Sequence, residues 1–203
     1  MTQEELNLAL LRAARSGDLA KVRETIGAGA KIDAATSDGT QSLHFAAVYG
    51  HRSVAEFLID RGAVIDAATR AGTQPLHFAA VSGHGKMAKL LIARGAQVDA
   101  GDIMGDQPLH YAAESGHKDV VELLLEHGAD PAATNDKGET ARDVCEKQGI
   151  AALLEDAERE WADPAAREKR KSEAEELRQG KARADVSAQQ RKLGALRRKG
   201  PSL

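Results

Sequence analysis

The chain has 203 residues, a formal net charge of −3, 42% hydrophobic residues and only 3% aromatic residues. Its single cysteine excludes a disulfide framework, and no apolar run reaches the length of a membrane span. We therefore expect a soluble protein of a reducing compartment, with a core of closely packed Ala, Leu, Ile and Val.

Taken in chain order, the sequence is a series of units with a period of 33 residues. The first unit occupies residues 4–35, repeats follow at 36–68, 69–101 and 102–133, and a shorter unit occupies 134–157. The register has no insertions, as a recurring alanine and a glycine four residues later show: Ala13, Ala46, Ala79 and Ala112; Gly17, Gly50, Gly83 and Gly116. A fixed period of this length predicts an elongated array of stacked units, which forms one domain over residues 1–157.

Each internal repeat has the pattern of a turn followed by two short helices. The first helix follows Gln41, Gln74 or Gln107 and ends at a Gly-His pair. The second helix carries an apolar stripe at i, i+4 and i+5, which requires burial against the neighbouring repeats. Gly62, Gly95 and Gly128 are expected to end the second helices in a left-handed conformation.

The repeat resembles the ankyrin repeat. Residues 72–80 read GTQPLHFAA, which is similar to the turn and first-helix element of that family. The resemblance implies an all-α solenoid of helix-turn-helix units with hairpin tips and a binding surface on its concave side. It also implies that the recurring histidines are structural residues that bond to neighbouring turns: His44, His77 and His110, and likewise His51, His84 and His117. A metal site would need several ligands at one point, whereas these histidines occur once per unit.

One position departs from the family pattern. The family pattern places threonine two residues after the turn glycine, but Gln41, Gln74 and Gln107 stand there and only Thr140 keeps it. A glutamine amide both donates and accepts hydrogen bonds, so the turn is expected to survive with altered bonding.

Both ends of the array are predicted to be capping units. In the first, Lys21, Glu24 and Thr25 stand where the next repeat has Val54, Phe57 and Leu58, which predicts a polar outer face. In the last, Gly149 holds the position of the helix-breaking glycines. Trp161 stands where a glycine ends the preceding repeats, so the final helix is expected to continue to Asp163.

Residues 158–203 are predicted to form a charged, basic tail that is helical or disordered. One helix is expected from Pro164 to Gly180, and a second from the capping box at Ser187 to Gly200. Neither has a good apolar face. The only large apolar residue of the first is Leu177, so this helix is expected to be solvated unless a partner holds it.

Catalytic residues are not indicated. The glycines follow the repeat period and form no phosphate-binding loop, and Asp33, Asp66 and Asp99 recur at the period instead of pairing. Cys145 takes the position of Ala112, which predicts a small buried side chain and not a nucleophile. We expect no enzyme activity, no cofactor, no metal and no small-molecule substrate.

The positions that vary between repeats indicate where a partner binds. Residues 36–68 and 69–101 agree at 20 of 33 positions, and the differences include the turn tips and the ends of the first helices. The apolar pair Ile103-Met104 is unusual for an exposed tip, and tyrosine and methionine are enriched in interface cores. The alternative is that Met104 packs on the neighbouring tip and Tyr49 covers its own helix. The predicted partner-binding residues are Val48, Tyr49, Arg70, Val81, Ser82, Ile103, Met104, Glu114 and Ser115.

The charge is unevenly shared along the chain. Residues 1–157 hold 15 Lys+Arg against 23 Asp+Glu, while residues 158–203 hold 13 against 8. No acid follows Asp185, so the basic cluster Arg197, Arg198 and Lys199 could contact phosphates, an anionic membrane or a nuclear import receptor.

Two functions follow from these features. The first is an adaptor or scaffold that is monomeric alone and binds a protein partner on the concave face. The second is a binder of nucleic acid or an anionic surface through the basic tail; it is the less favoured because the array is acidic. We expect a cytoplasmic location, with the nucleus as the alternative, since the N-terminal residues resemble neither a signal peptide nor a transit peptide.

Overall fold

A computed structural model describes residues 1–177, 179 and 180 of the chain. Its helices follow the 33-residue period as pairs, and a longer single helix closes the series. They are α1 Gln3–Ser16, α2 Leu19–Gly27, α3 Ser42–Val48, α4 Arg52–Asp60, α5 Pro75–Val81, α6 Gly85–Ala93, α7 Pro108–Ser115, α8 Lys118–Glu126 and α9 Gln148–Ala162. The tail is helical again over residues 164–177.

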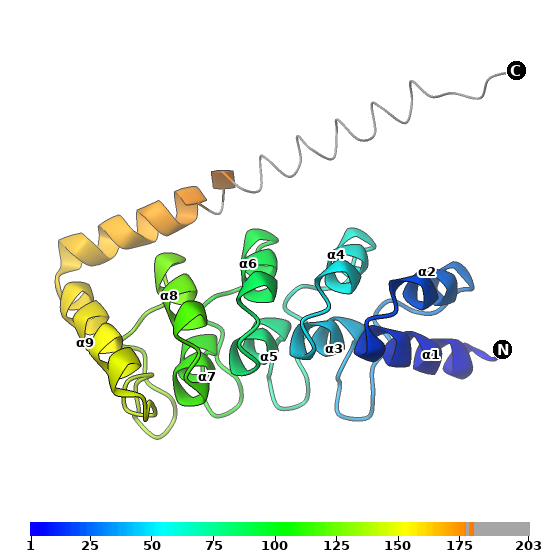
Figure 1. Ribbon diagram of the computed structural model, residues 1–203, viewed down its shortest axis with the longest axis horizontal. Coiled ribbons are helices and arrows are strands. Elements are labelled where there is room, and N and C mark those ends of the chain that lie inside the picture. Colours follow the sequence, from blue (N-terminus) through cyan, green and yellow to red (C-terminus); the bar gives the residue numbers. More distant parts are fainter. Residues whose placement is uncertain (178, 181–203) are drawn as a thin grey trace, which may run out of the picture.

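The helix pairs stack side by side into a solenoid (Figure 1). The first helices α1, α3, α5 and α7 form one row, the second helices α2, α4, α6 and α8 form another, and the turn tips extend beyond the first-helix row. In the described residues, β-pairing is limited to two isolated antiparallel bridges. One joins Ala35 to Gln41 and the other joins Thr134 to Thr140. The predicted all-α repeat solenoid is confirmed.

Local sequence signals set the helix ends. Thr2 and Glu5 form a capping box at the start of α1, and Pro75 opens α5. The glycines after the second helices adopt positive φ angles, as Gly62 does at 92°, and so end these helices as predicted. The glycines that follow the first helices also let repeats approach closely. A Cβ added to Gly17 would lie 2.5 Å from the His51 ring.

The core consists of small and aliphatic side chains. Ala46, Ala47 and Leu58 are completely buried, and the same positions are buried in the following repeats. Alanines at the centre of the stack let neighbouring first helices pack closely, which is how a chain with few aromatic residues fills its interior. The hydrophobic cluster runs without a break from Leu10 to Ala157.

Two sets of histidines join each repeat to the next. Nδ1 of His44 accepts a hydrogen bond from the backbone N–H of Gln41, and its Nε2 donates to the carbonyl oxygen of Ala67 at 2.8 Å. His77 and His110 use Nδ1 in the same way, but their Nε2 atoms donate to the carbonyl oxygens of Asp106 and Glu139, which lie at a later position of the repeat than Ala67 does. The second set donates from Nε2 back to the preceding unit, from His51 to Arg15, His84 to Val48 and His117 to Val81. The structural role predicted for these six histidines is confirmed.

The glutamines that replace threonine keep the turn but leave an acceptor unused. Their backbone N–H groups bond to the histidines, whereas the side-chain oxygens of Gln74 and Gln107 are buried without a hydrogen-bond partner in the described structure. At all three positions the glutamine forms a capping box with the histidine three residues later but makes no side-chain cap hydrogen bond, which is the altered bonding expected here.

The two end units differ from expectation at particular residues. Lys21 and Glu24 are exposed and form an ion pair, but Thr25 is only 2% exposed, and its buried hydroxyl donates to the carbonyl oxygens of Lys21 and Val22. In the last unit Gly149 does not break a helix; it lies in the first turn of α9. Cys145 is half-buried and not fully buried.

The last unit has a turn at residues 141–144 where the other units have a first helix. Asp143 accepts hydrogen bonds from both the backbone N–H and the hydroxyl of Thr140, which holds residues 140–143 in a turn. The chain then reaches α9 directly. Lys147 donates from Nζ to the carbonyl oxygen of Gly116, and its side chain packs where histidine packs at the other junctions.

The tail helix contacts the array at Ala174, although most of its residues are exposed as expected of a solvated helix. The Asp163 carboxylate accepts from the N–H of Ala165 and caps this helix. Ala174 is 4% exposed. A Cβ added to Gly128 would lie 3.0 Å from the Cβ of Ala174. Small residues make this contact, which a search for large apolar residues misses. In Figure 1 the tail helix turns back over the ends of α8 and α9, on the side away from the turn tips.

Candidate protein-binding surface

The turn tips are linked to one another through their backbones. The N–H of Arg70 donates to the carbonyl oxygen of Asp38, Ile103 donates to Ala71, and Asp136 donates to Met104. This ladder fixes the spacing of the tips and leaves their side chains outside. Arg70, Ile103 and Met104 are exposed, and the fraction reaches 64% for Ile103. The tips therefore offer a row of outward side chains on a rigid support.

Each first helix leaves residues at positions i, i+3 and i+4 exposed or half-buried, and these positions lie on one side of a helix. We call these residues together the first-helix face: Arg12, Arg15 and Ser16; Phe45, Val48 and Tyr49; Phe78, Val81 and Ser82; Tyr111, Glu114 and Ser115. The face is basic on α1, apolar on α3 and α5, and acidic on α7. The predicted binding residues thus form two rows. One is the tip row, which consists of Arg70, Ile103 and Met104, and the other belongs to the first-helix face.

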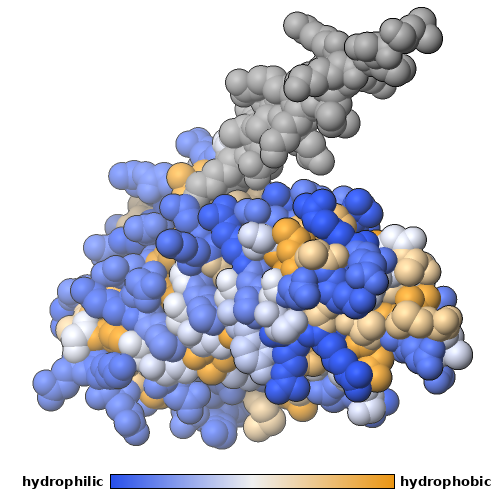
Figure 2. All heavy atoms as spheres, turned by 45° about the vertical axis from the view of Figure 1, so that its right-hand side comes forward, coloured by the Kyte–Doolittle hydropathy of each residue, from blue (hydrophilic) through white to orange (hydrophobic). Residues whose placement is uncertain are grey.

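The predicted residues are not equally accessible. Arg70, Val81, Ile103, Met104 and Glu114 are exposed. Tyr49 is exposed too, whereas Val48, Ser82 and Ser115 are half-buried. Figure 2 shows the hydrophobic side chains of one side of the molecule in small groups between hydrophilic ones. Among the predicted residues, an apolar contact therefore rests on the exposed side chains of Tyr49, Val81, Ile103 and Met104.

Tyr49 contacts residues of two units in the free protein. Its hydroxyl oxygen accepts a hydrogen bond from Nε of Arg15 at 3.2 Å, and the guanidinium carbon lies 5.8 Å from its ring centroid. On its other side the ring stacks with His51 at 6.0 Å. Tyr49 therefore joins α1 to α3, and replacing it would disturb the array as well as any interface.

A tyrosine braces the tip that carries Ile103 and Met104. The hydroxyl of Tyr111 on α7 donates to one carboxylate oxygen of Asp102 at 2.8 Å. The other oxygen accepts the N–H groups of Met104 and Asp106. Burial, followed by the hydrogen bond to Asp102, raises the pKa of Tyr111 to about 12, so this bond persists at neutral pH. The brace sets the angle between tip and helix.

Sequence reasoning missed the residues that determine the charge of the first-helix face. Arg12 and Arg15 lie in the first unit, which was interpreted only as a cap, and Phe45, Phe78 and Tyr111 precede the buried alanines. Helical spacing could have identified the three aromatic residues, since each lies three residues before a predicted residue, and the repeat period places Arg12 and Arg15 at the positions of Phe45 and Val48. The half-buried aromatic rings also pack edge-on against histidines of the preceding repeat, for example Phe78 on His44.

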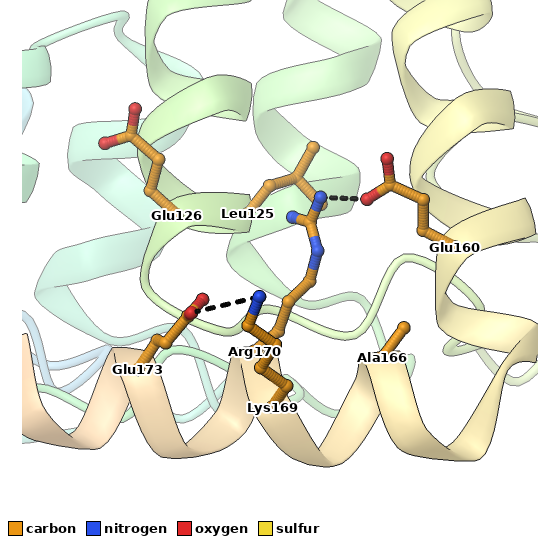
Figure 3. Close-up of a pocket in the computed structure, with 7 residues that line it drawn as sticks. All are labelled: Leu125, Glu126, Glu160, Ala166, Lys169, Arg170 and Glu173. Atoms are coloured by element: carbon orange, nitrogen blue, oxygen red, sulfur yellow. Dashed lines mark hydrogen bonds and ion pairs between the residues drawn. The ribbon is translucent and has the colours of Figure 1, made fainter.

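A cleft lies between the tail helix and the array. It has a volume of about 480 Å³ and is lined by Leu125, Glu126, Glu160, Ala166, Lys169, Arg170 and Glu173. Figure 3 shows that its charged groups face one another: Arg170 pairs with Glu160, and Lys169 lies 3.8 Å from Glu173. The Arg170–Glu160 pair joins the tail helix to α9, whereas Lys169 and Glu173 lie on the same helix.

Other kinds of site are not indicated. No group of three or more His, Cys, Asp or Glu side chains in the described residues could hold a metal ion. Within the same part of the chain, no helix is both long and apolar enough to cross a membrane. The predicted basic cluster of Arg197, Arg198 and Lys199 lies outside the described residues.

Stacked two-helix units, a histidine network between them and projecting tips define an ankyrin-type solenoid. The family of ankyrin repeats (three copies) matches residues 10–102 and 64–135. The chain belongs to this family, and the predicted resemblance is confirmed. No curated protein matches the chain. Ankyrin repeats generally serve as modules for protein–protein interaction.

Proposed function

We propose that the protein is an adaptor or scaffold that binds one protein partner with the tip row and the first-helix face. The observation that carries the proposal is the placement of exposed apolar side chains on rigid supports. Val81 lies on α5, and Ile103 and Met104 lie on a tip that Tyr111 and Asp102 brace. Anchors of this kind dominate binding energy when polar contacts surround them.

The position of the tail supports the same proposal. The tail helix contacts Gly128, which follows α8, and Figure 1 places this helix on the side away from the tips. The binding surface is therefore open in the described structure. In our proposal the tail provides a second contact or a helical extension within a larger assembly, and the protein acts in the cytoplasm.

Crosslinking mass spectrometry in the protein's own cell extract tests the proposal. The wild-type chain is compared with Val81→Glu/Met104→Glu, which places a charge in each row. The control is Val64→Glu, because Val64 is 60% exposed but lies after α4, outside both rows. We expect crosslinks from the partner to residues of the two rows, lost in the double variant and kept in the control. Crosslinks that all three chains share equally would place the partner elsewhere.

A further inference from the structure

The first-helix face has a charge order that the repeat pattern alone does not require. Arg12 and Arg15 are exposed one turn apart on α1, and Glu114 is exposed on α7. None of these three side chains forms an ion pair with another residue of the described structure. The exposed residues between them on α3 and α5 are the apolar Val81 and the aromatic Tyr49. The face is therefore basic at one end and acidic at the other, in an array that is acidic overall.

Arg15 is held in position for binding. Its Nε donates to Tyr49, whose ring is stacked on His51, and Nε2 of His51 donates to the backbone carbonyl oxygen of Arg15 at 3.1 Å. A guanidinium has five N–H donors, and the tyrosine uses only the one on Nε. The two terminal nitrogens remain for a carboxylate, which arginine binds through two parallel hydrogen bonds.

This arrangement occurs at one junction of the array. The positions of Arg15 and Tyr49 are held by Val48 and Ser82 at the next junction, and by Val81 and Ser115 at the one after. The histidine is present each time, so the structural link alone needs neither the arginine nor the tyrosine. The pair therefore adds a cationic group to a junction that is complete without it.

We propose that the partner lies along the first-helix face as an amphipathic segment with a fixed direction. Its carboxylates contact Arg12 and Arg15, its apolar side chains contact Tyr49 and Val81, and a basic residue contacts Glu114. Three helix spacings of about 8–10 Å separate α1 from α7, so an extended segment of about eight residues spans the distance. The inference rests on the proposed function and specifies the chemistry of the partner.

Selection of random 12-residue peptides on the intact protein tests the charge order. We expect the enriched peptides to carry Asp or Glu near one end, Lys or Arg near the other and apolar residues between. One selected peptide is then synthesised, together with a version in which the charges of its two ends are exchanged. Opposite charges in contact favour a single orientation and disfavour the reverse. The exchanged peptide should therefore bind the wild-type protein about tenfold or more weakly.

Variants of the protein complete the experiment. Arg12→Glu/Arg15→Glu should weaken binding of the selected peptide about tenfold or more. Adding Glu114→Lys to this variant should restore binding of the exchanged peptide. The matched control is Lys86→Glu/Lys89→Glu, which reverses two exposed charges on α6, outside the face. Circular dichroism and urea unfolding show that each variant is folded.

The outcomes separate this inference from the proposed function. If Val81→Glu/Met104→Glu abolishes peptide binding but Arg12→Glu/Arg15→Glu leaves it unchanged, the charge order is irrelevant and the inference is overturned, while the proposed function stands. If no selected peptide is affected by any variant of the two rows, the proposed function fails, and the inference fails with it.

Discussion

At the scale of single residues, the buried histidines determine how the array responds to acid. His44 and His77 are completely buried, and burial lowers the pKa of each below its ordinary value. Each ring uses Nδ1 as an acceptor, which requires the neutral form. Protonation would remove that acceptor and place a charge in the core.

The sign of the pH dependence follows from these lowered pKa values. An unfolded histidine titrates near pH 6.5, so below that pH the unfolded chain binds more protons than the folded one. The stability that these residues contribute is complete above about pH 6.5 and is lost as the pH falls below it. We expect the urea midpoint to drop between pH 7.5 and pH 5.5, with a smaller drop in His77→Gln. A midpoint that stays constant or rises on acidification would contradict this role.

At the scale of elements, the tail helix has a built-in reporter. Trp161 is the only tryptophan of the chain; it is 4% exposed, and Nζ of Lys171 lies 5.7 Å from its ring centroid. We expect Ala174→Glu to detach the helix. The space against Gly128 is buried, so a carboxylate there would lose its hydration without gaining a partner. Trp161 emission should then shift to longer wavelength and become more accessible to acrylamide.

A matched change on the same helix serves as the control. Ser172 is exposed, so Ser172→Glu adds the same charge without touching the array and should leave the emission unchanged. Identical spectra for wild type, Ala174→Glu and Ser172→Glu would show that the tail helix does not pack on α8 in solution.

The regular elements could be predicted from sequence, and the contacts between unlike elements could not. The helix pairs follow from glycines such as Gly62 and from apolar stripes that repeat every 33 residues, because each repeat packs only on its neighbours. The docking of Ala174 on Gly128 has no such periodic signal, and alanine on a charged helix resembles a solvated residue. The Arg15–Tyr49 contact joins two units and depends on their stacking, so neither residue alone predicts it.

At the scale of the whole molecule, the solenoid is stabilised by nearest-neighbour packing, and an internal residue should matter more than one at the end. Leu91 is completely buried on α6, whereas the carboxylate of Glu24 is solvated and pairs only with Lys21. We expect Leu91→Ala to lower the free energy of unfolding by about 2–5 kcal/mol, and Glu24→Ala to lower it by less than about 1 kcal/mol. Equal urea midpoints for the two variants would refute the assignment of Leu91 to the core of the stack.

The charge of the tail gives a prediction for the alternative function. A peptide of residues 158–203 contains 13 bases and 8 acids, so the acids offset much of its attraction to phosphates. Binding to DNA, RNA or anionic vesicles should be weak and should vanish near physiological salt, because ion release drives such binding. Sub-micromolar affinity at that salt in a fluorescence titration would favour the nucleic-acid or anionic-surface function over the adaptor.

The central claim is that the tip row and the first-helix face bind a protein partner. The most direct test is a calorimetric titration of the crosslinked partner, purified, against the wild-type chain, Met104→Glu and the control Val64→Glu. Met104 is exposed in the free protein, so its replacement should leave the urea midpoint nearly unchanged while weakening binding by more than about 1 kcal/mol. Equal affinity for all three chains would contradict the claim and place the partner on the second helices or the tail.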